Sequence, residues 1–142
     1  MIQLNKLFLR ILGGIAMDFT FLKKAGITPE NAIVRFMGDE GLYARMLEKF
    51  LDDRNYENLV AAVDEKDEKA ALTYSHTLKG LCGNLSMDRL FELFSEQVTL
   101  FRADKDDEAY ALMKDIHESY ELAVKTIKEW RHACNKTDKE SP

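Results

Sequence analysis

Cysteine is scarce in this chain of 142 residues. Its two cysteines, Cys82 and Cys134, lie far apart and have no Cys-x-x-Cys spacing. A small chain that relied on disulfides would contain more of them. We therefore expect a reducing, cytoplasmic setting.

The chain also lacks an excess of basic residues. Lys and Arg number 20 against 25 Asp and Glu, which gives a formal net charge of −5, and no basic cluster outnumbers the acidic residues beside it. Nucleic-acid binding requires a basic face toward the phosphates, so this balance argues against a nucleic-acid partner. A Gly-rich phosphate loop and a kinase ATP-binding segment are missing as well, so we expect no nucleotide chemistry in this chain.

Long apolar runs are absent, and no membrane span is expected. The first 17 residues, MIQLNKLFLRILGGIAM, place two basic residues ahead of a short apolar run, but a glycine pair breaks the run and no A-x-A cleavage site follows it. Apolar residues recur there at helical spacing. We expect an amphipathic helix at residues 1–17 that packs on the bundle or on another chain. A helix lying on a membrane surface is the alternative, and Met17 is an alternative start.

No segment alternates apolar and polar residues as a half-buried strand would. Instead, apolar residues recur at intervals of three and four in segments joined by short links, a pattern typical of antiparallel helices. The expected helices are a short one from Pro29, a long one at 40–66 bent near Asp53, one from Asp67 through 84, one after Ser86, and a last one from about Glu108 to Ala133. The sequence thus predicts an all-α, up-and-down four-helix bundle at 18–133 with additional N-terminal helices, followed by a polar tail at 134–142.

Helix ends carry their own signals. Gly26 is an expected stop, and the expected N-caps are Thr28, Asp39, Asp67 and Ser86, because a side-chain oxygen at that position can accept a hydrogen bond from a free N–H group of the first turn.

The stretch SHTLKGLCGN at 75–84 places two glycines, Gly80 and Gly83, inside a strong helical pattern. Glycine costs a helix interior about 1 kcal/mol relative to alanine. At about 100° per residue, the apolar residues of this helix gather on the side opposite His76: Ala71, Tyr74, Leu78, Leu81, Cys82 and Leu85. His76 is therefore expected to point outward, with both glycines on its own side, where they would clear the surface for a bulky partner.

The other residues on the face of His76 are Leu72, Thr73, Lys79 and, at its edge, Asn84. Leu72 is an apolar residue suited to a docking surface. Lys79 lies one turn beyond the histidine, where its charge can hold an anion at the imidazole. From the helical wheel alone, an ordinary surface histidine beside chance glycines is the alternative.

The stretch SHTLKGLCGNLSMDRL at 75–90 resembles the signature of the histidine-containing phosphotransfer (HPt) domain. That pattern is H-x-x-K-G-x-x-x-x-[LIVMF], with a small residue at the seventh position after the histidine. Upstream, NAIVRFMGDEGLYARMLEKFLDD at 31–53 is similar to the opening of bacterial HPt domains. The resemblance covers roughly residues 26–130 and implies a four-helix bundle that carries a phosphoryl group on His76.

The resemblance also implies roles for neighbouring residues. Lys79 would lie beside the phosphate, Gly80 would leave room for the partner, and Gly83 matches the second small position. Many family members place a Gln or Glu on the next helix, 22 positions after the histidine, where it hydrogen-bonds the imidazole. Here that position is Val98. The adjacent Gln97 is therefore expected among the residues that face the partner, with Leu72, Thr73 and Asn84.

The partners that the resemblance implies are response-regulator receiver domains and a hybrid sensor histidine kinase. The chain would be a freestanding phosphocarrier rather than an enzyme, with no cofactor of its own, because the receiver would supply Mg²⁺.

Two alternative functions remain open. A bundle that docks receiver domains without carrying phosphate is the first. A metal-binding bundle is the second, since Glu129 and His132 have the i, i+3 spacing of di-iron bundles. The metal reading is weak because such a site needs two of these motifs, and we expect no metal site.

Overall fold

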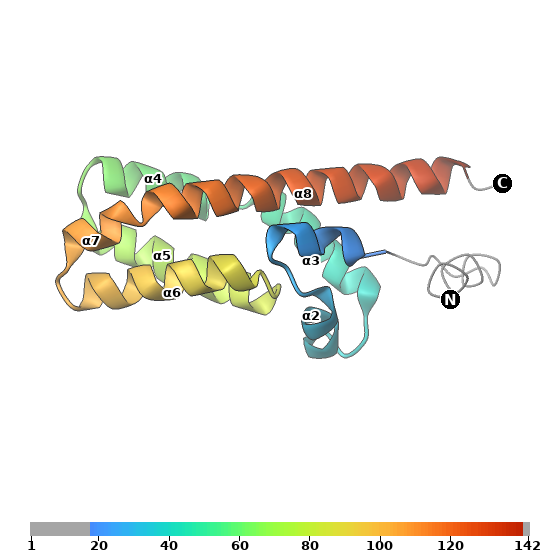
Figure 1. Cartoon of the computed structure of the whole chain (residues 1–142), viewed down its shortest axis with the longest axis horizontal. Coiled ribbons are helices and arrows are strands. Elements are labelled where there is room, and N and C mark those ends of the chain that lie inside the picture. Colours follow the sequence, from blue (N-terminus) through green and yellow to red (C-terminus); the bar gives the residue numbers. More distant parts are fainter. Residues whose placement is uncertain (1–17, 141–142) are drawn as a thin grey trace.

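The computed structural model describes residues 18–140, with side chains for residues 18–135, and the chain is an all-α helical bundle (Figure 1). The helix expected at 1–17 lies outside the described residues. The elements in order are the 3-10 helix η1 (Thr20–Ala25), then α2 (Pro29–Arg35), α3 (Glu40–Asp52), α4 (Asn55–Asp64), α5 (Glu68–Asn84), α6 (Asp88–Arg102), α7 (Asp106–Ala111) and α8 (Met113–Glu140).

Four helical passes form the predicted up-and-down bundle. The first pass is α3 followed by α4, the second is α5, the third is α6, and the fourth is α7 followed by α8. Helix α5 packs against α4 and α6, while α8 packs against α6 and α3, so the four passes enclose one core. The additional N-terminal helices are η1 and α2, and they gather with α3 at one end of the molecule beside α8 (Figure 1).

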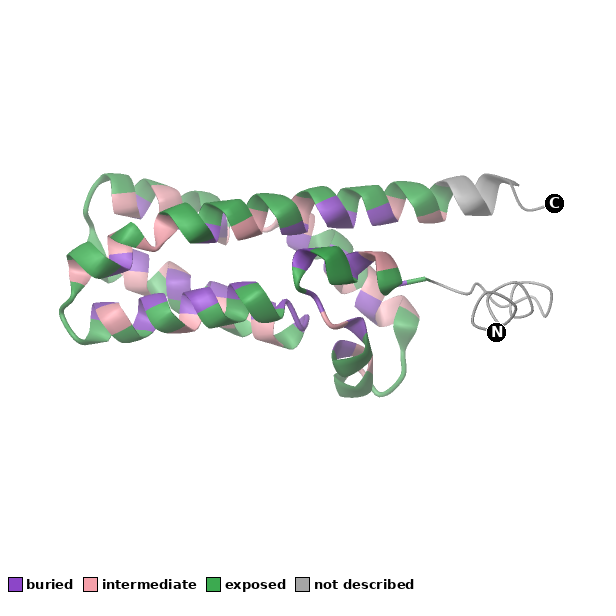
Figure 2. Ribbon diagram, viewed as in Figure 1, coloured by how far each residue is buried: buried purple, intermediate pink, exposed green. Residues whose placement is uncertain are grey.

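The core follows from the spacing of apolar residues. Tyr43, Leu47 and Phe50 of α3 are buried, as are Ile116 and Ile127 of α8. Figure 2 shows the buried residues on the sides of α6 and α8 that face each other, with exposed residues on the outer sides. Burial of one stripe on each helix is what holds the four passes together.

A cluster of three aromatic rings holds η1 against the bundle. The ring of Phe19, just before η1, lies 5.2 Å from the ring of Tyr43 and 5.4 Å from that of Trp130. The hydroxyl of Tyr43 donates a hydrogen bond of 3.0 Å to the carbonyl of Leu85 at the end of α5. The N-terminal elements are thereby fixed close to the C-terminus of α5.

Several expected helix ends are confirmed. The carboxylate of Asp39 accepts a hydrogen bond from the backbone N–H of Leu42, and that of Asp67 accepts one from Ala70. Gly26 ends η1 with a φ of +72°, in the left-handed region that glycine adopts readily. Thr28 occupies the expected N-cap position of α2, but its hydroxyl accepts no hydrogen bond from a backbone N–H of the first turn and donates to the carboxylate of Asp88 instead.

The expected cap at Ser86 is wrong. Helix α6 begins one residue later than that cap requires, at Asp88 after the N-cap residue Met87. Ser86 is buried with a φ of +55°, and its hydroxyl accepts a hydrogen bond from the guanidinium of Arg35.

The long helix expected at 40–66 is two helices. The backbone of Asp53 is extended, with a ψ of 136°, and its carboxylate accepts a hydrogen bond from the N–H of Asn55, which opens α4. The expected helix is therefore interrupted at this point rather than bent.

The last pass also differs from the prediction. A break at Leu112 separates α7 from α8. Helix α8 continues to Glu140, beyond its expected end at Ala133 and through most of the segment 134–142 that was expected to be a tail.

Candidate functional site

His76 lies on the exposed face of α5, as predicted. The four fully buried residues of this helix lie on the opposite side: Ala71, Ser75, Leu78 and Cys82. Tyr74 and Leu81, which were expected in the core stripe, are half-buried at its edges. Ser75 takes a central place in the core instead, which the pattern of apolar residues could not indicate.

Gln97 does not face a partner, so this sequence prediction is wrong. Its side chain is fully buried. The hydroxyl of Ser75 donates to Oε1 of Gln97 at 2.6 Å, and Nε2 of Gln97 donates to the carbonyl of Ala109 at 3.0 Å. Val98, at the position where the HPt pattern has a Gln or Glu, is also buried and has no polar group to offer the imidazole.

The two glycines of α5 have different surroundings. A Cβ placed on Gly80 would meet nothing within 4 Å, so the expected open surface is present there. A Cβ on Gly83 would lie 2.8 Å from Cδ1 and 3.0 Å from Cε1 of Phe91. The expectation of open space at Gly83 is therefore wrong: the ring of Phe91, from α6, fills it.

An open groove of about 950 Å³ lies between α2, the C-terminal half of α5 and the start of α6. Gly80, one turn after His76, lines it together with Gly83 and Asn84. Its apolar lining includes Val34, which is 76% exposed, and Phe91, which is 39% exposed. Large apolar side chains with this much exposed surface are a feature of binding sites when they are grouped.

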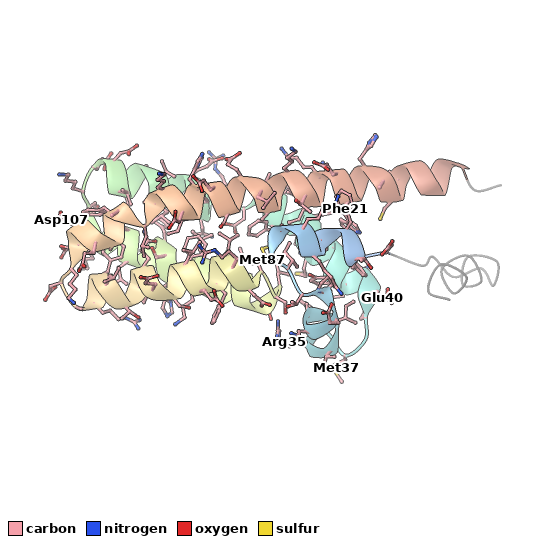
Figure 3. The ribbon with its side chains drawn as sticks, viewed as in Figure 1. Phe21, Arg35, Met37, Glu40, Met87 and Asp107 are labelled. Carbon is pink, nitrogen blue, oxygen red and sulfur yellow. The ribbon has the colours of Figure 1, made fainter. Side chains whose placement is uncertain are left out.

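Arg35 ties one wall of this groove to α5. Its Nη2 donates to the carbonyl of Gly83 at 2.8 Å, and its Nε donates to the carbonyl of Asn84 at 3.4 Å. The last carbonyls of a helix lack partners within the helix, so the guanidinium satisfies them. Figure 3 shows Arg35 near the start of α6 and Met37 at the far end of α2, where Met37 is 94% exposed.

The remaining predicted site residues divide by exposure. Thr73 is exposed, and its hydroxyl donates to the carbonyl of Lys69. Lys79 is half-buried and Asn84 is exposed. Leu72 is half-buried and packs against the core, so it contributes to the fold more than to an open docking surface.

Sequence reasoning missed Val34, Arg35 and Phe91. Val34 and Phe91 had one available signal, which is that each is a large apolar residue lying off the apolar stripe of its own helix. Arg35 had none, because its carbonyl partner at Gly83 is 48 residues away in the chain.

Other reactive side chains lie away from this groove. The hydroxyl of Tyr56 and Nδ1 of His117 share a hydrogen bond of 2.8 Å, and burial raises the pKa of Tyr56 to about 12. Burial also raises the pKa of the Cys82 thiol well above its usual value, which leaves it unreactive. The part of the chain that the structure describes contains no group of three or more His, Cys, Asp or Glu side chains placed to hold a metal ion.

Comparison with models of protein families gives no match, and comparisons with characterised proteins and with solved structures give none. Among the described residues, no helix combines the length and the apolar character needed to cross a membrane.

The surroundings of the two glycines predict different effects of alanine substitution on the free energy of unfolding. Gly80→Ala should raise the free energy of unfolding by up to about 1 kcal/mol, because it removes the helix penalty and meets open space. Gly83→Ala should raise the free energy of unfolding by less, or lower it, because the new methyl group displaces the ring of Phe91. Urea denaturation of both variants measures the difference.

A Phe91→Ala background is the matched control. There the methyl group at position 83 meets no ring, so Gly83→Ala should regain stability relative to the Phe91→Ala parent. An equal gain from Gly83→Ala with and without Phe91 would show that the ring does not restrict this position.

Proposed function

We propose that this chain is a phosphocarrier in which His76 accepts a phosphoryl group from the aspartate of a receiver domain and passes it to the aspartate of another. The observation that carries the proposal is the presentation of His76: an exposed imidazole on a helix whose opposite face is buried, with open space over Gly80 one turn further on. A large, structured partner can approach such an imidazole closely.

The chemistry requires little from this chain beyond the imidazole itself. The Nε2 lone pair attacks phosphorus, the bond from phosphorus to the aspartate oxygen breaks, and the carboxylate leaves with the bonding electrons while the N–P bond forms. Reversal of these steps on a second receiver returns the histidine. The receiver would supply Mg²⁺ and most of the charge stabilisation, so His76 is a reactant more than part of a catalytic centre.

Lys79 supports the proposal through its charge. It is half-buried and lies one turn from His76, on the same side of α5. A phosphoryl group on the imidazole carries negative charge, and a cation placed beside it would stabilise both the transferring group and the phosphohistidine.

The groove supports docking of the receiver. It begins at Gly80 and continues to the exposed side chains of Val34 and Phe91, so its apolar surface is continuous with the surface beside His76. Because Arg35 holds α2 to the end of α5, both walls are fixed before the partner arrives. A pre-formed apolar surface lowers the entropic cost of association.

The first test replaces the phosphoryl acceptor. His76→Gln should retain the helical circular dichroism but take up no acid-labile phosphate from phosphorylated receiver domains, because an amide cannot form the N–P bond. His117→Gln is the matched control and should take up phosphate as the wild type does. Phosphate retained in His76→Gln would move the acceptor elsewhere, and receiver binding without any uptake by the wild type would favour the adaptor function.

The second test concerns charge. Lys79→Ala should slow transfer to His76 by roughly tenfold, which corresponds to about 1.4 kcal/mol of lost stabilisation in the transition state. Lys69→Ala is the matched control. Lys69 is also an exposed lysine on the same side of α5 as His76, but it lies two turns before the histidine. Rapid-quench transfer assays measure both, and equal rates in the two variants would exclude a role for the Lys79 charge.

The third test concerns access. Gly80→Gln should unfold at the same temperature as the wild type or a higher one, since glutamine is the better helix former. It should also accept phosphate far more slowly, because its side chain would enter the open space beside the imidazole. Gly80→Ala should show an intermediate rate. Thermal melts and transfer time courses on the same preparations measure this, and a destabilised Gly80→Gln with normal transfer would contradict the access argument.

A further inference from the structure

A buried polar cluster lies directly behind the exposed histidine. Ser75 precedes His76 in the chain and is fully buried, as is its partner Gln97. The amide of Gln97 accepts from the Ser75 hydroxyl through Oε1, and through Nε2 it donates to the carbonyl of Ala109 and, at 3.2 Å, to the sulfur of Met113. A single side chain of α6 therefore contacts α5, α7 and α8.

This cluster also supplies a hydrogen-bond donor at the break in the last helical pass. In a continuous helix the carbonyl of Ala109 would accept from the N–H of Met113. At the break it accepts a shorter-range bond of 3.3 Å from the N–H of Leu112, and the amide of Gln97 supplies a second donor at 3.0 Å. Buried polar groups are costly unless they are paired, so the cluster is stable in one arrangement of these four helices.

Apolar contacts and a hydrogen bond both act on the rotation of α5. Three of its four fully buried residues are small (Ala71, Ser75 and Cys82) and Leu78 is large, while Leu72, Tyr74 and Leu81 pack against the core from the edges of the buried face. Apolar contacts have no fixed direction. The hydrogen bond from Ser75 to Gln97 is directional, so it adds a constraint on the rotation of the helix.

Rotation of α5 matters at His76 because the imidazole lies far from the helix axis. With side chains reaching about 5–6 Å from the axis, a rotation of about 10° moves the imidazole by roughly 1 Å. A displacement of about 1 Å from the reactive geometry can slow a reaction by about a hundredfold.

We propose that Gln97 is a positioning residue for phosphoryl transfer: through its hydrogen bond to Ser75 it fixes the rotation of α5, and with it the direction in which His76 meets a docked receiver domain. This inference rests on the proposed function of His76. It assigns Gln97 a role inside the core, without contact to the phosphate or the partner.

The test removes the hydrogen bond while keeping the volume of the core. In the double variant Ser75→Ala, Gln97→Met, both partners of this hydrogen bond are replaced by apolar groups, which limits the loss of stability. The carbonyl of Ala109 also loses the amide of Gln97 but keeps the N–H of Leu112 as a partner. The melting temperature should stay within about 5 °C of the wild type. Transfer from a saturating phosphorylated receiver domain should fall at least about tenfold, while the half-saturating receiver concentration changes little.

Phosphoramidate is the second donor, because it is small and does not dock. The imidazole Nε2 attacks its phosphorus, the P–N bond of phosphoramidate breaks and ammonia leaves. Labelling of His76 by phosphoramidate should proceed at the wild-type rate in the double variant. Tyr56→Phe is the matched control: it removes another partly buried hydrogen bond between helices, the one to His117, and should leave transfer from the receiver unchanged.

Three outcomes would overturn the inference. They are a normal saturating transfer rate in the folded double variant, an equal slowing with receiver and phosphoramidate, and an equal slowing in Tyr56→Phe. Should the double variant fail to fold, Ser75→Ala alone removes the hydrogen bond, and the same rate comparison applies. If the wild type itself accepts no phosphate from a receiver, the proposed function fails, a result distinct from the three above.

Discussion

Burial of one face of α5 between α4 and α6 is the constraint on which the rest of the structure depends. Because Ala71, Ser75, Leu78 and Cys82 point into the core, the opposite face of the helix must be exposed, and that face carries His76. The histidine is therefore displayed without any dedicated structure around it. The position of His76 follows from the burial of the opposite face of α5. The buried side of this helix is therefore as relevant to the site as its exposed side.

The groove beside His76 arises from contacts between segments that are distant in the chain. Arg35 joins α2 to the last carbonyls of α5, and the ring of Phe91 covers Gly83 from α6. Two glycines that look equivalent in the sequence thus have different surroundings: Gly83 admits an aromatic ring of the same chain, and Gly80 borders open space. The apolar side chains that line the groove stay partly exposed because α2 is held at a fixed position beside α5.

The proposed phosphocarrier function makes modest demands on such a bundle. Phosphoryl transfer to an imidazole needs an accessible nucleophile, a nearby cation and a partner that brings the metal ion. A helix surface can meet the first two demands with His76 and Lys79. What a helix surface does not supply is a fixed direction of approach, and in this bundle a buried amide at Gln97, rather than a residue beside the imidazole, is the group placed to provide it.

The sequence by itself determined the all-α bundle, the caps at Asp39 and Asp67, and the outward direction of His76, because each depends on helical periodicity or on residues within one turn. Only the tertiary structure decided the burial of Gln97, whose partner Ser75 is 22 residues away, and the filling of the space at Gly83 by a ring from α6. It also decided the break at Leu112, beside the amide of Gln97, and the exclusion of Ser86 from its expected cap. From the sequence of one helix, a polar side chain is expected to be exposed and a glycine to border open space. The neighbouring helix can change both, because burial and contact are properties of packed elements rather than of a single segment.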